Sequence, residues 1–124
     1  MRLLYEELTF VVRGYIYEVS NELGVGYDEH SYQLALEEKL RENNIPFKSQ
    51  VHGYVCHKGV KAQEFIADLI VDDVIILELK NIETGFHPNH VFQLLSYLKH
   101  WKKQLGLLVN FGLPKAKIQR VPFT

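Results

Sequence analysis

Apolar residues recur every three or four positions near the start of the chain, the spacing that places them on one face of an α-helix. They predict a helix over Leu8–Leu23, ended by Gly24 just past its last turn, where glycine is favoured. A second helix is predicted over Glu29–Asn43, with Asp28 as its N-cap and Pro46 beyond its end. The chain therefore opens with a pair of amphipathic helices.

After Pro46 the pattern changes to the alternations and apolar runs typical of β-strands. Three consecutive strands separated by short turns are predicted over Phe47–His57, Val60–Val71 and Val74–Lys80. The runs Leu69–Val71 and Val74–Leu77 are too apolar for a half-exposed surface and indicate central strands covered on both faces.

The last third of the chain returns to a helix and then to strands. A helix opens at Pro88 and runs to about Lys102, a buried strand covers Leu105–Phe111, and an edge strand covers Ile118–Phe123. A three-strand meander followed by a helical crossover to a further strand forms a mixed sheet with helices on its faces. The predicted class is α/β, with an α+β mixed sheet, in one domain that spans residues 1–124.

Composition narrows the class of protein. The 124 residues are 47% hydrophobic and 23% charged, which fits one globular core and excludes a disordered chain. The longest aliphatic run, Val74–Leu77, is far shorter than the ~20 residues of a membrane helix. Glu6 and Glu7 lie where a signal peptide would be apolar, and the single cysteine, Cys56, excludes an internal disulfide. We therefore expect a cytoplasmic protein that does not enter a membrane.

Charge is divided unevenly along the chain, although the net charge is −1. Residues 1–46 carry nine acidic and four basic residues, whereas residues 99–124 carry six basic residues and no acidic ones. A one-sided basic segment is compatible with contacts to phosphates. A solvated surface that balances the acidic helices explains the same pattern, and charge alone favours this simpler interpretation.

Charged residues interrupt the two most apolar strands. Asp68 lies inside one, and Glu78 and Lys80 lie on one face at the end of the next. Burying carboxylates there is costly unless they are paired or hold a cation. The spacing alone favours an ion cluster that only satisfies itself, but two acids against one lysine leave an uncompensated charge, which favours a divalent cation such as Mg²⁺. Such an ion activates water, and Lys80 would orient the resulting hydroxide or stabilise developing negative charge.

The turn between these strands sets how close the acids come. If Asp72 and Asp73 are the only turn residues, Val71 pairs with Val74. Asp68 then lies opposite Leu77 and diagonal to Glu78, and a small bulge would bring the two acids level.

Asp68, followed ten residues later by Glu78-Leu79-Lys80, resembles the D…(D/E)-x-K signature of the PD-(D/E)-x-K nuclease superfamily. A second motif, the one that names the GxxExxY family within that superfamily, is matched at its three fixed positions by Gly26, Glu29 and Tyr32. The resemblance covers about residues 8–121, nearly the whole chain.

This resemblance implies the restriction-endonuclease-like αβββαβ core, here with an extra N-terminal helix. Asp68 and Glu78 would bind Mg²⁺ or Mn²⁺, the Leu79 carbonyl would be a third protein ligand, and Lys80 would be catalytic. Glu29 would correspond to the helix-borne acid that supports the metal site in related nucleases. Its simpler role is that of a first-turn acid that interacts favourably with the helix dipole.

Three further residues are candidates for contact with nucleic acid. Tyr32 shares a helix face with Glu29, and its alternative is a core position. Gln93 and Tyr97 resemble the Gln-x-x-x-Tyr element of recombination-type exonucleases in the superfamily, where the pair lines the site and contacts nucleic acid. A buried polar pair that ties the helix to the sheet is equally open.

Two functions remain open at this point. One is a Mg²⁺-dependent nuclease that hydrolyses phosphodiester bonds in nucleic acid, with DNA as the expected substrate. The other is a catalytically inactive module on the same fold that binds nucleic acid or another partner. The intact Asp68, Glu78 and Lys80 favour the first. The small size favours the second, or work as a homodimer or as one subunit of a larger complex.

Overall fold

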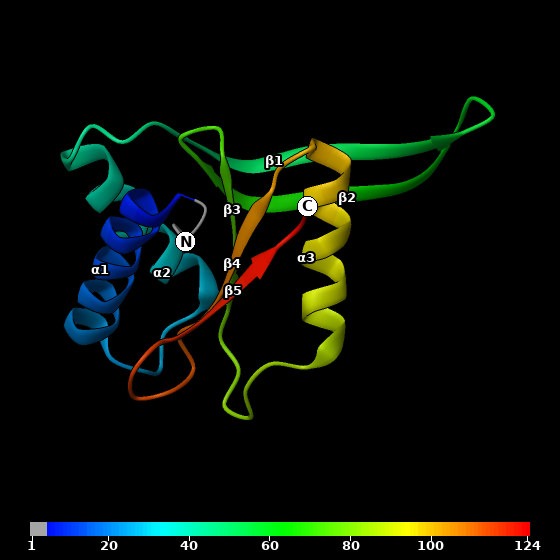
Figure 1. The fold of residues 1–124 in the computed structure, drawn as a ribbon. Helices are drawn as coiled ribbons and strands as arrows, with labels where there is room; N and C mark the ends of the chain where they lie inside the picture. The colour runs from blue at the N-terminus through cyan, green and yellow to red at the C-terminus, as the bar shows by residue number, and fades with distance from the viewer. Residues whose placement is uncertain (1–4) are drawn as a thin grey trace.

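Two helices, a long hairpin, and three further strands with a crossover helix follow one another along the chain (Figure 1). The structure is a computed structural model and describes residues 5–124. The elements are, in chain order, α1 (Glu6–Leu23), α2 (Glu29–Glu42), β1 (Phe47–His57), β2 (Val60–Val71), β3 (Ile75–Lys80), α3 (Pro88–Trp101), β4 (Leu105–Asn110) and β5 (Lys117–Pro122). This order confirms the predicted mixed α+β class, and no predicted boundary is wrong by more than two residues.

The strands form one five-stranded sheet in the order β1-β2-β3-β4-β5. Neighbouring strands are antiparallel except β3 and β4, which are parallel and are joined through α3. Parallel neighbours require such a crossover because the chain must return to the end of the sheet at which the first strand began. β3 is the central strand, as its apolar run predicted.

Helices cover both faces of this sheet. α1 and α2 pack on one face, where Leu36 and Leu40 meet Leu77 and Leu79 in the larger apolar cluster. α3 packs on the other face, in a smaller cluster built around Leu94, Leu98, Ile76 and Leu108. Within residues 5–124, none of the helices is long and apolar enough to cross a membrane.

Halfway along the β1–β2 hairpin, alternate side chains switch from one face of the sheet to the other. In β2, Ala67 packs in the α3 cluster, whereas Leu69 packs in the α1/α2 cluster, although residues two apart normally share a face. The residue between them is Asp68. Its counterpart in β1, Gln50, has a left-handed φ of 48° and is skipped by the backbone ladder. The hairpin is therefore distorted at Gln50 and Asp68, and its distal half passes over α3.

Candidate active site

The turn between β2 and β3 sets the register of the site. It contains three residues, Asp72–Val74, so Val71 pairs with Ile75. The predicted pairing of Val71 with Val74 is therefore wrong by one residue. Both aspartates have a left-handed φ, a conformation that aspartate adopts more readily than most residues, and this allows the longer turn.

The corrected register places Asp68 opposite Glu78 rather than opposite Leu77, so no bulge is needed to bring the acids level. The backbone ladder ends at the pair Leu69 and Leu77, and β2 and β3 separate beyond it. Side-chain bonds replace the ladder: the Asp68 N–H donates to Glu78 Oε1 (3.0 Å), and the Leu79 N–H donates to Asp68 Oδ2 (2.7 Å). Each carboxylate thus bridges the opening between the strands with one of its two oxygens.

Burial makes negative charge at this opening costly. Glu78 is only 4% exposed, and this burial, followed by the charge of Asp68, raises its pKa to about 8. Burial also raises the pKa of Asp68, although the Leu79 amide and the Lys80 ammonium partly oppose the shift. A bound cation would favour the ionised form of both groups, so the site is electrostatically suited to one.

Lys80, at the end of β3, acts on all the acids of the site. Its charge lowers the pKa values of Asp68, Glu78 and Glu29 against the larger effects of burial. Within residues 5–124, no direct ion pair joins Lys80 to any of the three. Burial, followed by the charge of Lys80, also lowers the pKa of His90 at the start of α3.

The G-x-x-E-x-x-Y segment forms the loop that leads to Glu29. Gly26 has a φ of 108°, which only glycine adopts without strain. The Tyr32 hydroxyl donates back to the Gly24 carbonyl (2.5 Å), and its ring stacks on Phe111 with centroids 4.6 Å apart. Tyr32 has no exposed surface, so its position fits the core alternative and offers nothing for a nucleic acid to touch.

The same loop is fastened to the end of the central strand. The Asn81 side chain, directly after Lys80, donates to the Tyr27 carbonyl. Asp28 caps α2 through a bond from Ser31 N (2.9 Å), as predicted, so the exposed Glu29 begins the helix. Desolvation by the surrounding protein raises the pKa of Glu29; the charge of Asp68 adds to this effect, and the charge of Lys80 opposes it.

Two glutamines support Asp68 from the α2 side. Gln50 donates to the Asp68 carboxylate and to Gln33 Oε1 (2.9 Å). The buried Gln33 in turn donates to Glu37 Oε2 (2.9 Å) and, over 3.4 Å, to the Asp68 carbonyl. We did not predict either glutamine. The spacing of Glu29, Gln33 and Glu37, a polar stripe at four-residue intervals on α2, is the signal that indicates Gln33.

The two candidates on α3 lie differently. Tyr97 is buried, and this burial and the charges of Glu78 and Asp68 raise its pKa to about 12. Its hydroxyl also bonds to the Ile66 backbone. Gln93, one turn earlier, is exposed, and among the described residues no hydrogen bond joins it to the site. Tyr97 is therefore buried and interacts electrostatically with the carboxylates, whereas Gln93 lies at the surface.

The donor atoms at the opening fit a divalent cation. Asp68 Oδ1 and Glu78 Oε2 are not used to bridge the strands. The N–H and C=O of one strand residue point to the same side, so the Leu79 carbonyl faces the opening into which its N–H donates. Oxygen donors suit Mg²⁺ and Mn²⁺. In residues 5–124 no three His, Cys, Asp or Glu side chains come together in a group that could hold a metal ion, and Mg²⁺ commonly completes its shell with water and substrate phosphate.

Comparison with known proteins agrees with this geometry. The family model described as the PD-(D/E)XK nuclease superfamily matches residues 6–121. A search of curated proteins gives no match.

Two solved structures share the fold. One is SSO0001, at 22% identity and a TM-score of 0.60 over 76% of this chain and 50% of that chain. The other is an alkaline exonuclease (LHK-Exo) from Laribacter hongkongensis, at 18% identity and a TM-score of 0.50 over 71% of this chain and 52% of that chain. This chain thus spans about half the length of each. The likeness confirms the predicted restriction-endonuclease-like architecture.

Proposed function

The chain belongs to the PD-(D/E)XK nuclease superfamily, and we propose that it is a metal-dependent nuclease that hydrolyses phosphodiester bonds in DNA. The observation that carries the proposal is the opening between β2 and β3, bridged by Asp68 and Glu78 and influenced by the charge of Lys80. The alkaline exonuclease among the structural neighbours supports the same reaction class. Membership of the GxxExxY family stays a prediction.

Each residue of the site has a proposed role. Asp68 and Glu78 would hold Mg²⁺ or Mn²⁺ with the oxygens that do not bridge the strands, and the Leu79 carbonyl would be the third protein ligand. When bound, the cation supplies Lewis acidity to water and positive charge to phosphoryl oxygens. Lys80, a compact point charge, would orient the attacking water and stabilise the charge that develops on the phosphate.

Residues at the edge of the site would support this chemistry. Glu29 would accept hydrogen bonds from water around the metal, because it lies at the surface beside Asp68 and Lys80. Tyr97 would act as a positioning residue, since its hydroxyl lies near the carboxylates but is buried. Gln93 is exposed and would contact the substrate directly.

The test combines cleavage with metal binding. Labelled single-stranded, double-stranded and branched DNA, with matching RNA, is incubated with Mg²⁺, with Mn²⁺ or with chelator. We expect metal-dependent cleavage by the wild type and none by Asp68→Asn, which removes a ligand charge. Asp72→Asn is the matched control, because Asp72 is an exposed aspartate in the turn beyond the same strand.

The outcomes separate the alternatives. Loss of cleavage and of Mn²⁺ affinity in Asp68→Asn, with both retained in Asp72→Asn, supports the nuclease. A wild type that binds nucleic acid but neither binds metal nor cuts would replace it with the inactive binding module. Cleavage of RNA alone would overturn the choice of DNA.

A further inference from the structure

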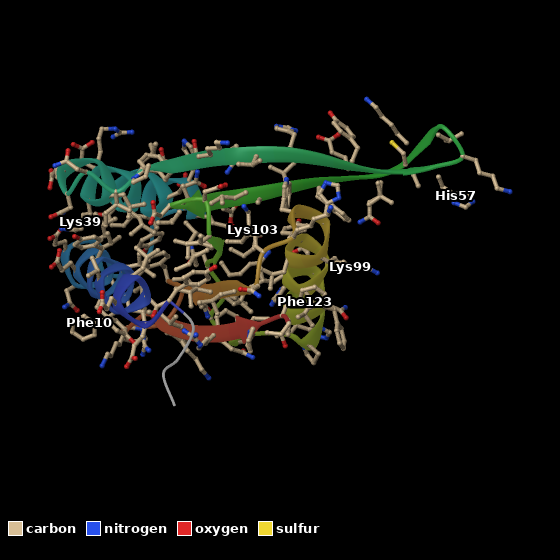
Figure 2. All side chains as sticks on the ribbon, turned by 45° about the horizontal axis from the view of Figure 1, so that its top comes forward. Phe10, Lys39, His57, Lys99, Lys103 and Phe123 are labelled. Atoms are coloured by element: carbon tan, nitrogen blue, oxygen red, sulfur yellow. The ribbon has the colours of Figure 1, made fainter. Side chains whose placement is uncertain are left out.

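The end of the β1–β2 hairpin projects beyond the rest of the protein, past α3 in Figure 1, with His57 near its tip in Figure 2. Every residue from 54 to 64 is exposed, and we call this segment the arm. Its backbone pairing nevertheless continues to the last pair, His57 and Val60. The Lys58-Gly59 turn has a positive φ at both residues, the geometry that matches the twist of a two-residue hairpin. The register shifts once within it, between Val55 and Cys56, so the arm is a paired but bulged ribbon with no core of its own.

The charge of the arm is positive toward its tip. Lys58 and Lys61 are its bases, and its only acid, Glu64, lies at the base and pairs with His52 (2.8 Å). Lys61 Nζ lies 4.1 Å from the centroid of the Tyr54 ring, so a cation and an aromatic ring stand together on an exposed surface. Cations and aromatic rings are the groups with which proteins bind nucleic-acid backbones and bases.

The surface beside the arm is also positively charged. Gly53, at the base of the arm, is packed so closely on α3 that an added Cβ would lie 2.5 Å from His100 Nε2. The end of α3 under this contact carries Lys99 and Lys102. No acidic residue occurs anywhere in residues 84–124. The arm and the end of α3 therefore form one side of the molecule that favours a polyanion.

A second copy of the chain is the competing occupant, because an exposed hairpin can pair edge to edge. Lysines near strand edges oppose such pairing. Lys58 and Lys61 lie in the arm, and like charges from two arms would repel one another. The charge therefore favours a nucleic acid over a second arm.

We propose that the arm binds the backbone of a duplex whose other end lies at Asp68 and Glu78, an inference that rests on the proposed function. β2 continues from the arm to Asp68 across the register shift, with Lys61 seven residues away. At ~3.3 Å per residue this separates them by ~23 Å. A duplex advances ~3.4 Å per base pair, so the arm reaches phosphates about seven base pairs from the site.

The test measures binding without cleavage, by fluorescence anisotropy in chelator. Lys58→Gln/Lys61→Gln removes two arm charges, and Arg13→Gln/Arg41→Gln removes two from the α1/α2 layer as the matched control. Each is compared with wild type on hairpin duplexes with stems of about 5 and about 24 base pairs, the first too short to reach the arm from the site, across a salt series. We expect the arm variant to bind the long duplex about tenfold more weakly, with a salt slope smaller by about two, and the short duplex nearly as wild type. The control should match wild type on both.

Each of the other outcomes would contradict a defined part of the proposal. Equal salt slopes for the arm variant and wild type would overturn the proposal that the arm binds the duplex, while leaving the nuclease proposal intact. An equal loss on both duplex lengths would place the lysines at the site and also overturn it. A change in molecular mass by light scattering, with unchanged nucleic-acid affinity, would assign the arm to self-association. A wild type that binds no duplex and cleaves none would overturn the proposed function itself.

Discussion

The two helical layers of this sheet differ in both charge and packing. The α1/α2 layer is acidic, with nine carboxylates in residues 5–46, and it covers the larger apolar cluster, where Leu36 and Leu40 are fully buried. The α3 layer belongs to the acid-free stretch 84–124, covers a smaller cluster and leaves the arm unsupported beyond it. The opening between β2 and β3 acts on both layers: after burial, the charge of Asp68 raises the pKa of Glu29 in one, and the charge of Glu78 raises that of Tyr97 in the other.

This difference separates the residues that stabilise the fold from the residues of the candidate site. The α1/α2 cluster buries apolar side chains, which stabilises the folded state by roughly 25 cal/mol for each Å² removed from water. The site instead buries Glu78 against Asp68, so ionisation of these carboxylates is costly in the metal-free fold. We therefore expect substitutions in the first region to change stability, and those in the second to change activity.

The largest effect on cleavage is expected for Lys80→Ala, in the candidate site. The loss of a fixed charge where negative charge develops should reduce cleavage by roughly 10²- to 10³-fold. Mn²⁺ affinity should stay the same or increase, because a repelling cation is gone. Single-turnover cleavage and Mn²⁺ titration measure both effects. Lys117→Ala, an exposed lysine at the start of β5, is the control. Equal cleavage by Lys80→Ala and wild type would contradict a catalytic lysine.

The opposite result is expected for Leu36→Ala in the α1/α2 cluster. Removing a fully buried leucine leaves a cavity, and such changes cost about 2–5 kcal/mol of unfolding free energy. Urea unfolding measures the loss, and Leu34→Ala is the control because Leu34 lies on the same helix but is 52% exposed. Under conditions where Leu36→Ala is still folded, its cleavage rate should match wild type. A lower rate at full folding would show that the α1/α2 layer takes part in activity.

The sequence predicted the first region better than the second, for physical reasons. The helices and strands were found because local periodicity and caps such as Asp28 determine them. The pairing of Asp68 with Leu77 was wrong because one extra turn residue, Val74, shifts every pair, and no local pattern reports it. Gln50 was not predicted because its contacts with Asp68 and Gln33 arise only when a strand distortion brings a strand and a helix together.

A smaller effect is expected for the stability of Glu78→Gln in the absence of metal. The pKa of Glu78 is raised from 4.5 to about 8, so between these pH values the folded wild type holds a proton that the unfolded chain has lost. The wild type must then lose stability as pH rises through this window, whereas Glu78→Gln should lose less, because only the raised pKa values of Asp68 and Glu29 remain. Each unit of pKa shift corresponds to ~1.4 kcal/mol, so the variant should gain at least ~1 kcal/mol over wild type above pH 8.

Thermal unfolding from pH 4 to pH 9 in chelator tests this linkage, with Glu83→Gln as the control for an exposed acid just past β3. The gain should vanish near pH 4, where both states of the wild type are protonated. Mn²⁺ should raise the melting temperature of the wild type but not of Glu78→Gln. A variant that is less stable than wild type at pH 9 would mean that the Glu78 charge is already compensated in the metal-free fold.

The smallest effect is expected for Tyr97→Phe, which tests whether the α3 layer reaches the chemistry at all. The substitution removes the hydroxyl near Glu78 and Asp68 but keeps the ring that packs on Phe65, with centroids 5.2 Å apart. Because one neutral hydrogen bond contributes about 1 kcal/mol, loss of the bond to the Ile66 backbone should lower stability by about that amount, and cleavage by the folded variant should fall roughly fivefold. The loss should not depend on duplex length, since Tyr97 is buried and cannot touch distant phosphates. Gln93→Ala, on the exposed surface of the same helix, should instead weaken substrate binding with the single-turnover rate at saturation unchanged. If Tyr97→Phe changed the apparent affinity for DNA and not this rate, Tyr97 would act in substrate binding rather than in positioning the carboxylates.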